Sequence, residues 1–178
     1  QVISGLEGVL ACESSIAYID GSIPELSFRG YDIHEIAQTL TFEQVTFLLW
    51  HDRLPSADEL RAFSADLAGR RAVPKPIMDV LRALPSSGHP MAGLRTAVSM
   101  LGAMDAHAED ISPEDNLRKA KDLTAQMPTI VAAQARLQRG QEPIAPDPSL
   151  SHAANYCYML TGKRPDDMTT RTFDTMLI

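Results

Sequence analysis

"HPMAGLRTAVSMLGAMD", residues 89–105, has the pattern of a helix that is covered on more than one side. Pro90 suits a first helical turn, because the missing N–H of proline has no partner there anyway. The large apolar residues lie on one face, and the other face is mostly small. The two sets are Met91, Leu94, Val98 and Leu101, against Ala92, Gly93, Thr96, Ala97, Ser99 and Ala103. Gly93 and Gly102 each cost about 1 kcal/mol relative to alanine, so we expect another backbone to approach them closely.

The rest of the chain after Tyr31 has further helical patterns, separated by capping residues and prolines. Asp32 can cap a first short helix, and Thr41 with Gln44 and Ser56 with Glu59 have the spacing of capping boxes. In the third helix, apolar residues repeat at i, i+3 and i+7 on one face, at Leu60, Phe63 and Leu67. The expected helices cover residues 33–40, 42–51, 57–71, 76–84, 90–104, 113–139, 149–161 and 169–178.

The longest expected helix covers residues 113–139. Ser112 is its N-cap, and Gly140 follows its last turn. Pro128 lies inside it, and helical periodicity continues beyond, so we expect a kink there but no end. The residues expected on the buried face are Leu117, Thr124, Met127, Ile130, Val131 and Leu137. We expect Asp147 and Pro148 to open the next helix and Gly162 to end it.

Only the first part of the chain resembles β structure. The segments "VLACESSIAYID" (9–20) and "ELSFRG" (25–30) flank "GSIP" (21–24), which has turn chemistry. A length of 178 residues fits one domain with a substantial core. We therefore predict an all-α, multi-helical fold with a small N-terminal β-ribbon.

Composition and charge exclude several classes of protein. The net charge is −7, and the densest basic run, "GRRAVPKP" (69–76), reads as a solvated helix end, so we expect no nucleic-acid partner. The sequence contains no apolar run of membrane-spanning length and no secretory signal. Cys12 and Cys157 are far apart, and we interpret them as half-buried or buried thiols in a reducing compartment. We therefore expect a cytoplasmic protein without a membrane partner.

The candidate catalytic groups do not form a recognisable site. The five histidines, His34, His51, His89, His107 and His152, do not have the spacing of metal ligands, and structural or surface roles are expected for His51, His89 and His152. Asp166 and Asp167 are adjacent, and adjacent helical residues point apart. The segment 21–30 lacks the pattern of a phosphate-binding loop. We therefore predict no catalytic, substrate-binding, cofactor-binding or metal-binding residue in this chain, and no bound cofactor.

Five blocks of sequence, in order and at matching spacing, together resemble the N-terminal portion of bacterial citrate synthases. They are "GLEGVLACESSIAYIDG" (5–21), "SFRGYDIHEIA" (27–37), "FEQVTFLLWHDRLP" (42–55), "HPMAGLRTAV" (89–98) and "LSHAANYCYMLTG" (150–162). The resemblance covers essentially the whole chain but less than half of a family member. It implies that residues 1–178 form the N-terminal part of the large domain of such an enzyme, truncated before the small domain.

The resemblance also implies partners and an activity. The helices around 90–104 and 113–139 match those that pack across the dimer axis in the family, so we expect a homodimer. The family condenses oxaloacetate with acetyl-CoA, through a carboxylate that removes a proton, a histidine that stabilises the enol and arginines that hold the dicarboxylate. Many relatives carry a basic residue near the CoA where this chain has Ser4, which weakens any CoA contact from this end.

None of the family's catalytic blocks is present. The final helix, with Phe173 and Leu177 on one face, resembles one that continues in the family into L-H-A-D-H; the H-G-G-A-N and G-H-x-V-Y-K blocks follow later. We therefore expect this chain to be inactive alone and its last apolar face to be partly uncovered. The intact protein would be a citrate synthase, with 2-methylcitrate synthase or a non-catalytic helical dimerisation module as alternatives. The sequence after Ile178 in the gene would distinguish them.

Overall fold

The computed structural model describes Gly5, Gly8 and residues 12–178, and within this part the fold is all-α with one small sheet. The strands are β1 (Ala17–Asp20), β2 (Glu25–Phe28) and β3 (Tyr31–Asp32), which form an antiparallel sheet in that order. The helices are α1 (Ile33–Thr39), α2 (Phe42–His51), α3 (Ala57–Gly69), α4 (Lys75–Ala83), α5 (Pro90–Met104), α6 (Pro113–Gln138), α7 (His152–Thr161) and α8 (Asp167–Leu177).

The β-ribbon is present where the sequence predicts it, but it is shorter and has an additional strand. Ala17 pairs with Phe28 and Asp20 with Glu25 across the β1–β2 turn. β3 was not expected, and it pairs with the end of β2 before the chain enters α1. Residues 9–11 of the expected strand, and Ser4, lie outside the described residues.

The expected capping residues begin the helices. The Asp32 carboxylate accepts the His34 N–H at 2.7 Å, and both capping boxes are complete, at Thr41–Gln44 and Ser56–Glu59. One prediction is wrong: α7 begins after Ser151, whose hydroxyl accepts the Ala154 N–H, and not at Asp147. The Asp147 carboxylate instead accepts the Ser149 N–H and closes a turn in the connector.

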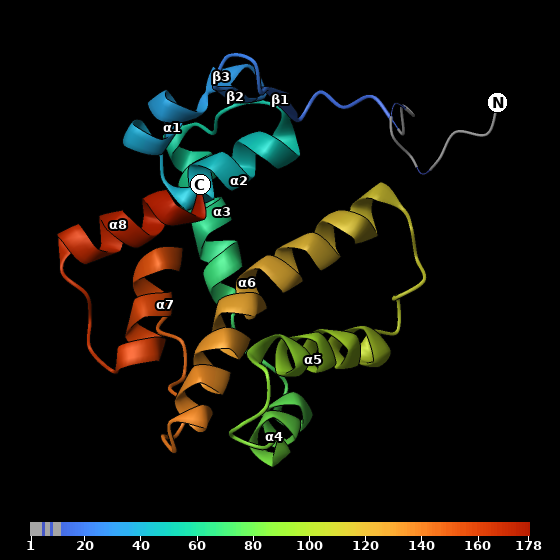
Figure 1. The fold of residues 1–178 in the computed structure, drawn as a ribbon, viewed down its shortest axis with the longest axis vertical. Coiled ribbons are helices and arrows are strands. Elements are labelled where there is room, and N and C mark those ends of the chain that lie inside the picture. The colour runs from blue at the N-terminus through green and yellow to red at the C-terminus, as the bar shows by residue number, and fades with distance from the viewer. Residues whose placement is uncertain (1–4, 6–7, 9–11) are drawn as a thin grey trace.

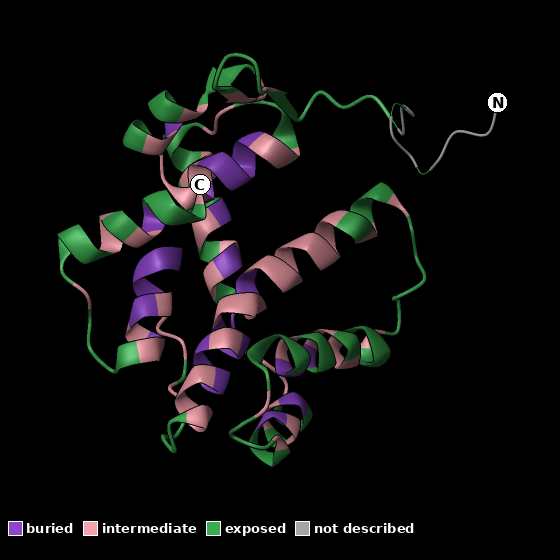
Figure 2. Ribbon diagram, viewed as in Figure 1, coloured by how far each residue is buried: buried purple, intermediate pink, exposed green. Residues whose placement is uncertain are grey.

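Helix α6 is the central element of the molecule. It contacts α3, α4, α5 and α7, and Figure 1 shows it running diagonally through the fold, with a change of direction near its middle. The helix is continuous from Pro113 to Gln138 and includes Pro128. This agrees with the prediction of a kink that does not end the helix. Figure 2 shows buried residues along α2, α7 and the C-terminal half of α6, while α5 is largely exposed.

The face of α6 that is buried differs from the one predicted from its large side chains. Of the predicted residues, only Ile130 is fully buried, and the other five are half-buried. The remaining buried residues are Ala125, Thr129, Ala132, Ala133 and Gln134. Four helices contact α6, so its deepest positions are occupied by small side chains that allow close approach.

In α5, too, the buried residues are small ones and not the large apolar residues that the sequence pattern suggested. Gly93 and Ala97 are its buried residues, Leu94, Val98 and Leu101 are half-buried, and Met91 is 61% exposed. Only Gly93 and Ala97 of the small residues therefore pack inside the chain, while Ala92, Thr96, Ser99 and Ala103 are exposed.

Gly93 and Gly102 have different environments, although the sequence suggested one reason for both. A Cβ atom on Gly93 would lie 2.4 Å from Gln134 Nε2 and 3.0 Å from a methyl group of Leu84. The Gln134 amide needs this space, because its Nε2 donates to the carbonyl oxygen of Pro90 at 2.9 Å. A Cβ atom on Gly102 would meet nothing within 4 Å. A buried side chain thus explains Gly93, where the sequence suggested a second backbone.

The two glycines provide a matched test of this packing. Gly93→Ala and Gly102→Ala gain the same helix propensity, about 1 kcal/mol. Only Gly93→Ala must displace the buried Gln134 amide and overpack Leu84, so we expect it to be less stable than Gly102→Ala by about 1–3 kcal/mol. Urea unfolding of both variants gives this difference. Equal stabilities would show that Gln134 does not require the missing Cβ.

Candidate functional site

The five histidines of the described part of the chain occupy different structural positions. His34 is exposed beside Asp32, and His107 is exposed in the loop after α5. His89 is the N-cap of α5, where its Nδ1 accepts the Met91 N–H at 3.2 Å. His51 ends α2 and lies 4.2 Å, between ring centroids, from Phe47. Burial, with the charges of Lys121 and Arg53, lowers the pKa of His51.

No metal-binding group of three or more His, Cys, Asp or Glu side chains occurs among the described residues. Asp166 is the N-cap of α8 and accepts the Thr169 N–H at 2.7 Å, while Asp167 belongs to the first turn. Cys157 is buried as expected, but Cys12 is exposed. None of the described helices is long and apolar enough to cross a membrane.

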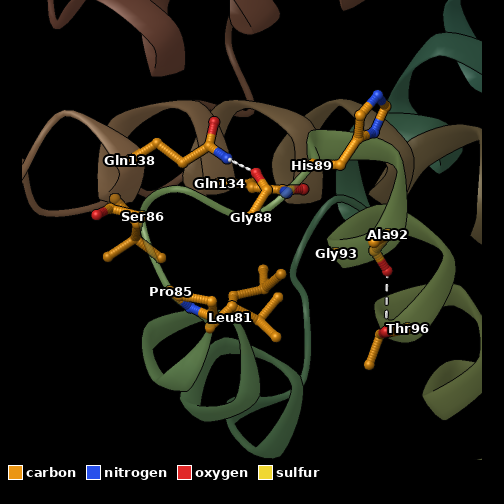
Figure 3. Close-up of a pocket in the computed structure, with 12 residues that line it drawn as sticks. Leu81, Pro85, Ser86, Gly88, His89, Ala92, Gly93, Thr96, Gln134 and Gln138 are labelled. Atoms are coloured by element: carbon orange, nitrogen blue, oxygen red, sulfur yellow. Dashed lines mark hydrogen bonds between the residues drawn. The ribbon is translucent and has the colours of Figure 1, made fainter.

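A small cavity of about 220 Å³ lies between the end of α4, the start of α5 and the end of α6 (Figure 3). Gln138 Nε2 donates to the carbonyl oxygen of Gly88 at 2.9 Å, and Gln134 Nε2 donates to that of Pro90 at 2.9 Å. The two glutamines lie one turn apart on α6 and hold the α4–α5 connector and the start of α5. This volume is below the usual range for ligand pockets, and the polar groups around it are used in packing.

The most concentrated buried chemistry lies where α7 begins. His152 is 4% exposed, and its ring stacks on Phe42 with centroids 4.4 Å apart. The buried Glu43 carboxylate accepts the backbone N–H of His152 at 2.8 Å. An anion is favourable there, because the N-terminus of a helix carries partial positive charge. Burial lowers the pKa of the His152 imidazole to about 4; the Glu43 carboxylate opposes this shift and the Arg71 guanidinium reinforces it.

Arg71 contradicts the interpretation of "GRRAVPKP" as a solvated helix end. Its side chain extends into the molecule, and the residue is 3% exposed. Its Nη1 donates to the carbonyl oxygens of Asp147 and Leu150, both at 2.9 Å, and its own carbonyl accepts the Thr129 hydroxyl. Burial lowers the pKa of this guanidinium. Arg71 therefore fixes the connector before α7 to the centre of α6.

Helix α8 is attached to the α1–α2 corner through polar side chains. The Arg171 guanidinium donates to the carbonyl oxygens of Leu40 and Ala37, both at 2.8 Å. The buried Asp174 carboxylate accepts the Phe42 N–H at 3.1 Å and pairs with Arg171 at 3.3 Å. Burial raises the pKa of Asp174. These bonds hold one side of α8 and orient its apolar side toward α6.

Between α6, α7 and α8 lies the groove that we call the α6–α8 groove, with a volume of about 520 Å³. Apolar side chains dominate its lining, and Leu123, Met127, Val131, Phe173, Met176 and Leu177 are among them. Met176 is 73% and Leu177 42% exposed, as expected for the last apolar face of the chain.

The sequence of this chain matches a known protein family. The family model described as "Citrate synthase, C-terminal domain" matches residues 5–178. The chain belongs to the citrate synthase family. The citrate synthase of Haloferax volcanii is 46% identical over 98% of this chain and 47% of that protein. The 2-methylcitrate synthase of Mycobacterium tuberculosis is 37% identical over 100% of this chain and 45% of that protein.

Solved citrate synthases share the fold. The crystal structure of citrate synthase from Pyrobaculum aerophilum superposes with a TM-score of 0.89 at 37% identity, over 98% of this chain and 46% of that one. The enzyme from Thermotoga maritima gives 0.84 at 34% identity, over 98% and 45%. The chain spans about half the length of the citrate synthases that it matches.

Sequence reasoning missed the buried cluster of Glu43, Arg71, His152 and Asp174. Its members come from four separate segments, so no local spacing reveals them. Only Glu43 carried a local signal, since a charged residue on the buried side of α2 needs a buried partner.

The His152 environment predicts a specific pH dependence. A folded pKa of about 4 against an unfolded value near 6.5 means that the unfolded chain binds more protons between these pH values. The contribution of His152 to stability is therefore present above pH 6.5 and is lost as the pH falls toward 4. Lowering the pH from 7.5 to 5.0 should cost about 2 kcal/mol through this group.

Urea unfolding at both pH values tests this, with His152→Gln as the variant that cannot titrate. We expect that variant to lose much less stability than the parent chain, while His34→Gln, at an exposed position, should behave like the parent. Asp174 acts in the opposite direction, since its raised pKa favours the folded state at low pH. An unchanged pH slope in His152→Gln would contradict the assignment.

Proposed function

We propose that this chain supplies the helical scaffold of a citrate synthase and has no catalytic activity by itself. One observation carries the proposal: the similarity runs through the whole chain at up to 46% identity, yet covers only 47% of that relative. The buried carboxylates near His152 are bonded to the backbone of neighbouring helices: Glu43 accepts the His152 N–H and Asp174 accepts the Phe42 N–H. The groups that the family resemblance assigns to catalysis are expected in the other part of the enzyme.

The reaction proposed for the intact enzyme is condensation of acetyl-CoA with oxaloacetate, an acyl transfer in which the acyl group becomes an alkyl group. A base removes a proton from the methyl carbon of the thioester, that carbon bonds to the ketone of oxaloacetate, and hydrolysis of the thioester releases CoA. Acetyl-CoA is thus a substrate, and we propose no bound cofactor. A cytoplasmic location remains the expectation, consistent with two free thiols.

A second candidate is 2-methylcitrate synthase, in which the acyl donor has one more carbon. The match to the Mycobacterium tuberculosis enzyme supports this second candidate, since that protein is 37% identical over the same residues. One extra methylene is discriminated by only about 1–3 kcal/mol in a hydrophobic pocket. The residues described in this chain offer no basis for choosing between the two acyl donors.

The purified chain should release no detectable CoA from acetyl-CoA and oxaloacetate. Catalytic groups act as a unit, so losing even one of them costs orders of magnitude in rate. Adding a polypeptide with the remaining part of the Haloferax volcanii enzyme should restore CoA release. Propionyl-CoA in a parallel assay reports the acyl preference. Turnover by this chain alone, from a host lacking citrate synthase, would overturn the proposal.

We also propose that the chain forms a homodimer through α5 and α6. The exposed side of α5 supports this, because Ala92, Thr96, Ser99 and Ala103 make a smooth surface beside exposed Met91 and Met104. An interface of roughly 2,000 Å² or more is typical of such dimers. Ala97 is unsuitable as a probe, since it is fully buried within the chain. Gly102 is exposed and its substitution leaves the core intact.

Sedimentation velocity tests the dimer. Gly102→Asp should convert it to monomer without changing the helical content, because a charge would be buried between the subunits. Gly69→Asp introduces the same change at another exposed glycine, at the end of α3, and should remain dimeric. If the parent chain sediments as a stable monomer, this part of the proposal is wrong.

A further inference from the structure

The two halves of α6 are held by different kinds of contact. Every fully buried residue of this helix lies at or after Ala125, and residues 113–124 include none. Figure 2 shows the contrast, with buried positions only in the middle and the C-terminal half of α6. The loop before the helix, residues 105–112, is mostly exposed, and its Ile111 is 84% exposed. Apolar burial therefore contributes little to holding this loop and the N-terminal half of α6.

A group of ion pairs centred on Arg118 holds the start of the loop to α6. The Arg118 Nη2 lies 2.7 Å from the carboxylate of Asp105, the C-cap of α5. Its Nε lies 2.6 Å from the Asp115 carboxylate and its Nη1 lies 3.2 Å from that of Asp122. One guanidinium therefore joins the end of α5 to two successive turns of α6.

Lys119 holds the rest of the loop. Its Nζ donates to the carbonyl oxygen of Ala108 at 2.9 Å and also to that of Asp110. The same ammonium lies 3.1 Å from the Asp115 carboxylate in the first turn of α6. The loop is thus attached to α6 through charged side chains at both of its ends.

Asp122 extends the ion pairs to α3. Its Oδ1 accepts from Arg70 Nη1 at 2.7 Å, and its Oδ2 accepts from Arg118. Arg70 also pairs with Asp66 at 2.6 Å, and Lys121 of α6 pairs with Asp66 at 2.8 Å. The Asp122 carboxylate therefore connects the pairs on α3 with those around the loop.

These ion pairs are accessible to salt. The exposed fractions of the side chains of Arg70, Asp115, Arg118 and Asp122 lie between 13% and 36%. The screening length falls from about 10 Å at 0.1 M salt to about 3 Å at 1 M. Arg118 lowers the pKa of Asp115 to about 2, so this carboxylate stays charged near neutral pH. Ionic strength is therefore the variable that weakens the network.

We propose that the ion pairs centred on Arg118 and Asp122 form an electrostatic strap, and that residues 105–124 open as one unit at high ionic strength while the rest of the chain stays folded. Proteins open locally in cooperative units, and segments with few buried apolar contacts open most easily. A network of several charges can hold such a segment, although an isolated exposed pair contributes little. The strap does not rest on the function proposed above.

Opening of the strap would change the apolar surface between α5 and α6. A cavity of about 430 Å³ lies there, lined by Arg118 and Asp122 together with apolar side chains that include Leu101 and Leu123. Both leucines are half-buried while the strap is closed. The strap thus makes the exposure of this apolar surface depend on salt.

Native-state hydrogen exchange of the 178-residue chain at pH 7, in 0.1 M and 1 M NaCl, tests the strap. We expect the protection factors of residues 117–122 to fall about tenfold at the higher salt concentration, because the ion pairs are screened. Those of residues 129–133, which lie in the buried half of the same helix, should change less than twofold. An equal loss of protection in both halves would be global destabilisation and would overturn the proposal, as would no loss in residues 117–122.

Asp122→Asn removes the connecting charge with almost no change of shape. We expect it to show the faster exchange of residues 117–122 already in 0.1 M NaCl and to respond less than threefold to added salt. Asp79→Asn is the matched control, because Asp79 of α4 also pairs with two cations, Lys75 and Arg82. It should leave the exchange of residues 117–122 as in the parent chain. Equal behaviour of the two variants would contradict the central position of Asp122.

Two further observations complete the test. Slow exchange of residues 129–133 in each variant shows that its core is folded. Sedimentation velocity in 0.1 M and 1 M NaCl separates local opening from dissociation of the proposed dimer. We expect the faster exchange without a change of sedimentation coefficient. Faster exchange that appeared only together with dissociation would overturn the strap.

Discussion

Close packing around the middle of α6 is the constraint on which the rest of the structure depends. Ala125, Ala132 and Ala133 are buried there, and α3, α4, α5 and α7 all contact this helix. Small side chains allow neighbouring helix axes to approach, which buries large residues of the other helices, such as Ile77 and Leu81 of α4. Side-chain bonds then attach the loops to α6: Thr129 to Arg71, Gln134 to Pro90 and Gln138 to Gly88.

Features determined by local chemistry could be predicted from the sequence. The capping boxes at Thr41 and Ser56 and the cap at Ser112 depend on residues within one helical turn, and all are formed. Gly162 ends α7 at φ 80°, which glycine adopts without a steric penalty. The proline inside α6 was also interpreted correctly, because periodicity on both sides of it is itself a local signal.

The errors concern positions whose environment is set by distant segments. The large residues of α5 and α6 suggested the buried faces, yet most of the buried positions hold small side chains. Little space is left for side chains where two helices approach most closely. The basic run around Arg71 predicts a solvated side chain, but its partners are the carbonyls of Asp147 and Leu150. The cluster around His152 likewise joins segments more than 100 residues apart. The sequence pointed to the family through five blocks, and the absence of a predicted active site followed from the blocks it lacks.

The outer side of α5 has exposed Met91 and Met104, and the α6–α8 groove has exposed Met176 and Leu177. Because the other helices pack on α6, we expect the middle of α6 to be the most stable part of the chain. Native-state hydrogen exchange resolved by residue tests this directly. We expect the amides of Thr129–Ala133 to exchange most slowly and those of Glu25–Phe28 to exchange fastest among the hydrogen-bonded elements. If the middle of α6 exchanged as fast as the ribbon, α6 could not be the element around which the fold is built.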